Sequence, residues 1–154
     1  MLNDFIIRLF FETIYFSLII FLVLFYLKLS RIVIRYRREF KVSLGSKKNE
    51  KLERVIRAHA NFNEHVPLGI VLSFFTYFNN FIILSCIALI FLFVGRILHA
   101  KSIIDINEKK IGFNTRILGM RLTFYSHLIS ILGIILYLIQ MIYYNLKNVL
   151  PSNT

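Results

Sequence analysis

The sequence predicts an all-α integral membrane protein, a bundle of four helices. Three observations support this fold class: 57% of the 154 residues are hydrophobic, these residues are gathered in long runs, and the charged residues lie between the runs. A helix needs about 20 predominantly apolar residues to cross the hydrocarbon core of a bilayer. Soluble domains of this length are rarely so apolar. We therefore expect a single membrane domain over residues 1–154.

Four spans are expected along the chain, at about 9–29, 54–78, 81–100 and 117–144. The first, third and fourth are apolar runs in their own right. The second is too short to cross unless its helix begins in the polar stretch before it. Asn79 and Asn80 follow it and are typical turn residues, so only a tight hairpin separates it from the third span. The two longer loops, at about 30–53 and 101–116, then lie on the same side.

Positive charge is concentrated around these two loops. Of the 19 Lys and Arg residues, eleven lie in residues 28–57 and five in residues 101–121. The positive-inside rule places both loops in the cytoplasm and both termini on the outer side. Lys and Arg beside a span are typical of contact with anionic membrane lipids, so we expect lipid rather than nucleic acid as the partner. The abundance of Ile, Asn, Lys and Phe is typical of AT-rich coding and favours a bacterial inner-membrane protein.

The start of the second span carries a polar stripe. At about 100° per residue, one helix face about 100° wide holds Glu53, Arg54, Arg57, Asn61 and Glu64. Ionisable residues at membrane depth are costly and by default indicate a function. Arginine, amide and carboxylate groups together suit a small zwitterionic ligand. We therefore predict a ligand-binding stripe; the alternative is a structural set of interhelical hydrogen bonds with an Arg–Glu pair.

The stretch "ERVIRAHANFNEHVP" (53–67) resembles the second-helix signature of the MAPEG family, the membrane-associated proteins of eicosanoid and glutathione metabolism. Two weaker resemblances are "GRILHA" (95–100) in the third span and "NTRILGMRLT" (114–123) at the start of the fourth. Together they cover nearly the whole chain and are similar to the small bacterial members. The resemblance implies a homotrimer that binds glutathione between subunits, near the cytoplasmic face.

The same resemblance implies roles for individual residues. Arg116 stands at the position that stabilises the glutathione thiolate, with Arg96 and Arg121 as nearby alternates. His59 stands where members direct a side chain at the ligand of a neighbouring subunit. His65 and His99 replace tyrosines of the eicosanoid synthases, which favours glutathione binding over the particular eicosanoid chemistry. The expected glutathione-binding residues are Arg54, Arg57, His59, Asn61, Glu64, His65, Arg96 and His99.

The expected function is that of a glutathione-dependent transferase or peroxidase acting on lipophilic electrophiles from the bilayer. No metal site is expected, and the single cysteine, Cys86, excludes an intramolecular disulfide. Three alternatives remain. A small proton-coupled exporter would use Glu12 of the first span, although this carboxylate can pair with Arg8 one turn away. A haem-binding bundle would use two of the four histidines. A MAPEG-type fold that has lost catalysis would serve as a binding protein.

Overall fold

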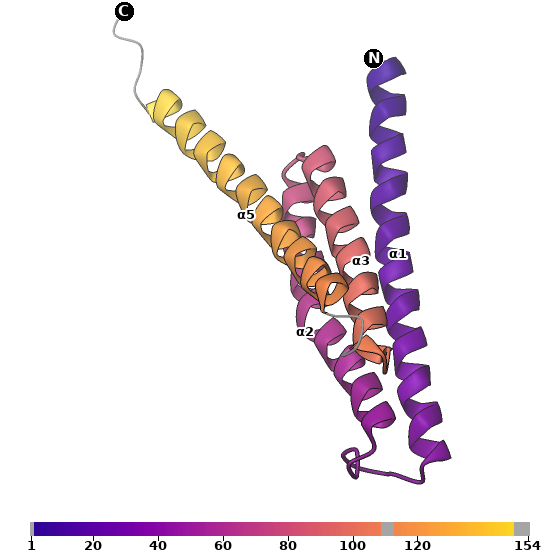
Figure 1. Cartoon of the computed structure of the whole chain (residues 1–154). Coiled ribbons are helices and arrows are strands. Elements are labelled where there is room, and N and C mark those ends of the chain that lie inside the picture. Colours follow the sequence, from indigo (N-terminus) through magenta and orange to yellow (C-terminus); the bar gives the residue numbers. More distant parts are fainter. Residues whose placement is uncertain (1, 109–112, 150–154) are drawn as a thin grey trace, which may run out of the picture.

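The computed structural model describes residues 2–108 and 113–149 and is built from four α-helices (Figure 1). These are α1 (Leu2–Glu39), α2 (Glu50–Phe78), α3 (Ile82–Ile104) and α5 (Asn114–Val149). No strand occurs in the described ranges, so the predicted all-α class is confirmed. The helices run alternately up and down, which places the start of α1 and the end of α5 at one end of the bundle and the two longer connections at the other. Lys109 and Lys110 of the second predicted loop lie outside the described residues.

The first helix is longer than the apolar run that predicted it. α1 continues through the basic stretch to Glu39, because Lys and Arg are good helix formers and neither Gly nor Pro interrupts residues 28–39. The connection to α2 is therefore 40–49, shorter than the predicted 30–53. Arg37 folds this connection back against α1 by donating to the carbonyl oxygens of Ser43 at 3.1 Å and Gly45 at 3.2 Å.

The polar stripe and the apolar segment that follows it form one helix. The side chain of Asn49 caps the start of α2 by accepting a hydrogen bond from the Leu52 amide at 3.0 Å. The helix then runs through Pro67 to Phe78. The predicted turn at Asn79 and Asn80 is confirmed: Asn80 has a φ of 67°, a conformation that Asn tolerates better than most residues.

The third helix is the centre of the bundle. α3 packs against α1, α2 and α5, and its contact with α5 is the most extensive in the described chain. Two glycines allow the backbones of α3 and α5 to touch: a Cβ added to Gly119 would lie 2.7 Å from the Gly95 carbonyl oxygen and 2.7 Å from the His99 amide nitrogen. This close crossing places the start of α5 beside the end of α3, where the charged groups gather.

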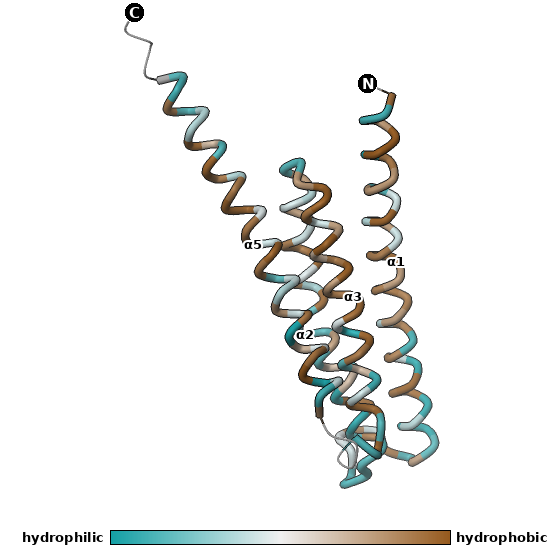
Figure 2. The backbone as a smooth tube through the Cα atoms, turned by 45° about the horizontal axis from the view of Figure 1, so that its top comes forward, coloured by the Kyte–Doolittle hydropathy of each residue, from teal (hydrophilic) through white to brown (hydrophobic). Residues whose placement is uncertain are grey.

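Among the helices of the described ranges, α1, α3 and α5 are long and apolar enough to cross a membrane. α2 does not reach the same apolarity because its first half carries the stripe, yet it lies against α3 and is joined to it by a short turn. In Figure 2 hydrophilic residues gather at the end that holds the two connections, and the outer halves of α1 and α5 are mostly hydrophobic. Residues 2–10 and 135–148 are all exposed. The chain is thus an integral membrane protein with apolar surfaces that suit contact with lipid.

Candidate functional site

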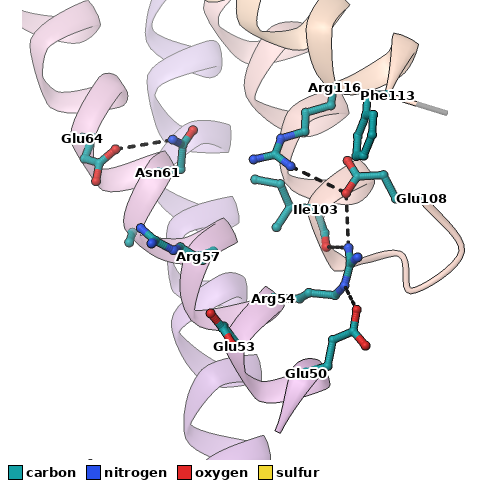
Figure 3. Close-up of a pocket in the computed structure, with 11 residues that line it drawn as sticks. Glu50, Glu53, Arg54, Arg57, Asn61, Glu64, Ile103, Glu108, Phe113 and Arg116 are labelled. Atoms are coloured by element: carbon teal, nitrogen blue, oxygen red, sulfur yellow. Dashed lines mark hydrogen bonds and ion pairs between the residues drawn. The ribbon is translucent and has the colours of Figure 1, made fainter. Parts of the chain in front are cut away.

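A cavity of about 580 Å³ lies at the end of the bundle that holds the two connections (Figure 3). One wall is the polar face of α2, and the other is formed by the end of α3, the segment after it and the start of α5. Its size is typical of small-molecule sites. The lining residues are Glu50, Glu53, Arg54, Arg57, Ala60, Asn61, Glu64, Ile103, Glu108, Phe113 and Arg116.

Five of the nine predicted site residues meet in this cavity. Four come from α2, because the 3.6-residue period places them on the same side of the helix. The fifth, Arg116, reaches the cavity from the first turn of α5 and faces the stripe across it. The five are Arg54, Arg57, Asn61, Glu64 and Arg116.

Arg54 ties α2 to the segment that follows α3. Its Nη1 donates to the carbonyl oxygens of Ile103 at 2.9 Å and Asp105 at 3.0 Å and to the Glu108 carboxylate at 3.2 Å. Its Nε donates to Glu50 at 3.1 Å. Only 11% of the Arg54 side chain is exposed. A guanidinium has five N–H donors, so these bonds already use much of its capacity.

Glu108 is the buried anion of the site. Its side chain is 3% exposed and accepts hydrogen bonds from Ser102 Oγ at 2.8 Å and from Arg54. Its Oε2 also lies 3.7 Å from Nη1 of Arg116. This residue was not predicted from the sequence, because it lies in the short segment after α3, close to a second acid, Asp105, and outside the periodic pattern of the predicted spans. Its position between Arg54 and Arg116 becomes visible only in the folded structure.

Arg57 has capacity left for a ligand. It lines the cavity and is exposed, and it forms no hydrogen bond or ion pair with any residue that the structure describes. Glu64, two turns further along α2, is also exposed and accepts one hydrogen bond of 3.4 Å from the amide of Asn61. The cavity therefore presents a cation and an anion on one helix face, separated by an amide.

Arg96 supports this face from behind. It is 1% exposed, lies on α3 and does not line the cavity. Its Nη1 donates to Asn61 at both the side-chain oxygen, at 3.0 Å, and the carbonyl oxygen, at 3.3 Å. Since the amide oxygen of Asn61 is occupied in this way, the NH₂ group of the amide is the part directed at Glu64.

His99 and His65 lie outside the cavity, between the helices. The ring of His99 is buried, and its Nδ1 lies 3.1 Å from the carbonyl oxygen of Arg116, so it contacts the first turn of α5 rather than the ligand space. The ring of His65 faces α5, with ring centroids 6.1 Å from both Phe124 and His127. At about 100° per residue, His65 falls about 80° from Arg57 and so at the edge of the stripe, and packing against α5 turns it out of the cavity.

His59 lies on the other side of α2 from the stripe, as its position in the sequence predicts. Its ring packs on Tyr26 of α1 at 5.1 Å between centroids. Within the described residues, no group of three or more His, Cys, Asp or Glu side chains is arranged to hold a metal ion. The role of His59 toward a neighbouring subunit stays a prediction.

Comparison with known proteins places the whole arrangement in one family. The sequence model of the MAPEG family matches residues 15–142, a range that contains every residue lining the cavity. No curated protein matches the chain. The match extends over most of the sequence, and the helical bundle agrees with the membrane fold of that family. The chain belongs to the MAPEG family, whose members include glutathione-dependent transferases and peroxidases as well as inactive proteins.

Proposed function

We propose that the protein is a membrane-bound glutathione-dependent transferase or peroxidase that acts on lipophilic electrophiles. The observation that supports this best is the cavity in which Arg57, which has no polar partner among the described residues, lies beside Asn61 and Glu64 and opposite Arg116. Glutathione carries two carboxylates, one ammonium group and one thiol. A site for it therefore needs both charge signs close together, together with a cation for the thiolate.

Arg57, Asn61 and Glu64 hold the charged ends of the tripeptide in this proposal. The planar guanidinium of Arg57 suits bidentate binding of a carboxylate, and Glu64 pairs with the ammonium group. Arg54 has a different part: it fixes the wall of the cavity, because its donors are bonded to α3, to Glu50 and to Glu108. Arg96 holds the amide of Asn61 in place, so it orients a binding residue without reaching the ligand.

Arg116 is the proposed catalytic residue. A free thiol has a pKa of about 8.5, so it is mostly protonated at neutral pH, whereas the thiolate is the nucleophile. A guanidinium within a few ångströms favours the thiolate and lowers the pKa of the bound thiol. The thiolate then attacks an electrophilic carbon, a C–S bond forms, and the leaving group departs with the bonding electrons. The Arg116 side chain is 44% exposed and reaches the cavity, which leaves it accessible to such a thiol.

The proposal includes a homotrimer with the site at subunit interfaces. Arg57, Glu53 and Glu64 are exposed in the single chain, and unmet polar groups facing lipid would cost several kcal/mol. A neighbouring subunit would cover them and would bring its His59 toward the ligand.

In the proposed orientation the cavity lies at the cytoplasmic side of a bacterial inner membrane, and both termini lie outside. The second substrate would reach the site from the bilayer.

The test is titration of the purified protein with glutathione, followed by conjugation of a generic aryl halide. Arg57→Ala should raise the glutathione Kd about tenfold or more, which is about 1.4 kcal/mol. Arg116→Ala should leave the binding of a thiol-free analogue nearly unchanged and should raise the pKa of the bound thiol, followed by thiolate absorbance against pH. Arg121→Ala is the matched control, because Arg121 is exposed on α5 and does not line the cavity.

Each outcome of this test has a clear reading. Absence of glutathione binding would refute the proposal. Binding without conjugation of any electrophile would instead indicate the catalytically inactive binding protein. Equal loss of binding in the Arg57 and Arg116 variants, with no change in thiol pKa, would show that Arg116 does not activate the thiol.

The proton-coupled exporter gains no support from the geometry of its required carboxylate. Glu12 lies 3.0 Å from Nε of Arg8, the pairing that the sequence predicts, and accepts a hydrogen bond of 3.3 Å from the Tyr77 hydroxyl. It lies near the start of α1, at the opposite end of the bundle from the cavity. A coupling carboxylate is expected near the middle of the membrane and facing a pathway.

A further inference from the structure

A second set of cations lies on α1, away from the candidate site. Lys28, Arg31 and Arg35 follow one another at spacings of three and four residues, so they share one face of the helix. All three are exposed, and none forms a hydrogen bond or ion pair within the described residues. Arg35 makes a cation–π contact with the ring of Tyr36 at 5.5 Å. Arg37, by contrast, is bonded to three carbonyl oxygens of the following connection.

These cations line a hollow together with apolar side chains. The hollow has a volume of about 440 Å³ and no acidic lining residue in the described chain. Leu24 lies one turn before Lys28 and Leu27 one turn before Arg31, and both are exposed. The hollow is lined by Leu24, Leu27, Lys28, Arg31, Ile32 and Arg35. Along α1 it therefore changes from apolar to cationic where the apolar run of the helix ends.

We propose that this face of α1 binds an anionic phospholipid, with the phosphate against the three cations and the acyl chains along Leu24 and Leu27. Charge complementarity supports this occupant, since unpaired cations beside a membrane attract anionic headgroups. The order of the groups also supports it: an apolar surface at bilayer depth continues directly into the cations, as the acyl chains of a lipid continue into its phosphate. This site needs no glutathione and stands apart from the proposed function.

The test compares two triple variants of the full-length protein with the same change in net charge. The site variant replaces the groove cations: Lys28→Gln, Arg31→Gln and Arg35→Gln. The control variant replaces three exposed lysines outside the groove: Lys41→Gln, Lys47→Gln and Lys48→Gln. Native mass spectrometry in mild detergent measures the Kd for phosphatidylglycerol and, as the uncharged reference, for phosphatidylcholine.

The site variant should bind phosphatidylglycerol on the order of 100-fold more weakly than the native protein, or about fivefold for each cation lost. The control variant should keep its affinity, and the affinity for phosphatidylcholine should be similar in all three proteins. Equal losses in the two variants would mean diffuse attraction and would overturn the proposal. A change of oligomeric state with unaltered lipid affinity would overturn it too, because this face would then be a contact between copies of the chain. If the site variant does not fold, the three single variants, each about fivefold weaker, decide in its place.

Discussion

Replacing Glu108 by alanine should destabilise the protein far more than an ordinary loss of one acidic residue. Its carboxylate is 3% exposed and accepts from Ser102 at 2.8 Å and Arg54 at 3.2 Å, while Arg116 is 3.7 Å away. A hydrogen bond that involves a charged group contributes about 1.5–3 kcal/mol. The contact with Arg116 adds little, since that side chain is 44% exposed and solvent screens the pair. Arg54 keeps its other partners, so the expected total is about 3 kcal/mol.

Thermal unfolding in mild detergent measures this cost. About 2–4 °C of Tm is lost for each kcal/mol in a chain of this size, so Glu108→Ala should lower the Tm by about 6–12 °C. Glu50→Ala is the matched control, because Glu50 bonds the same arginine from a side chain that is 56% exposed. Its cost should stay below about 1 kcal/mol. Glu108→Gln keeps an acceptor for Arg54 and should recover part of the loss. Equal Tm values for the Ala variants of Glu108 and Glu50 would refute the reasoning.

Three further predictions concern the fold and the alternatives. Gly119→Ala should lower the free energy of unfolding by about 1–3 kcal/mol and weaken glutathione binding, because the new Cβ would clash with backbone atoms of Gly95 and His99 on α3. Leu118→Ala, at the neighbouring exposed residue, is the control in the same unfolding and titration assays. Glu12→Gln should leave glutathione conjugation unchanged, whereas loss of proton-driven efflux in this variant would favour the exporter. A C-terminal reporter that is active only outside the cytoplasm should give a signal. A signal from a reporter that is active only in the cytoplasm would reverse the proposed orientation.

The parts of the site that follow helical periodicity were predictable from the sequence. Arg57, Asn61 and Glu64 meet in the cavity because residues three and four apart share a helix face whatever packs against them. The turn at Asn79 and Asn80 was predictable for a similarly local reason, since Asn accepts the left-handed conformation found at Asn80.

The contacts of Glu108 could not be predicted in this way. Glu108 follows α3 after a turn whose direction the sequence does not reveal, and its partners Arg54 and Arg116 are brought to it by two different helices. His65 lies at the edge of the stripe, where a small rotation of α2 decides which neighbour it faces, and α5 supplied that neighbour. Helical geometry fixes a face, while tertiary packing decides what reaches the residues at its margin.

The outer end of α5 has a consequence for how the protein responds to its bilayer. After Gly133, which is buried against Thr76 and Leu84, residues 135–148 are all exposed. At 1.5 Å per residue this stretch is about 20 Å long, roughly two thirds of the hydrocarbon thickness of a bilayer. The start of α1 is likewise exposed over residues 2–10. We therefore expect a mismatch between protein length and bilayer thickness to be absorbed by tilting of these two ends, while the charged cavity at the opposite end keeps its shape.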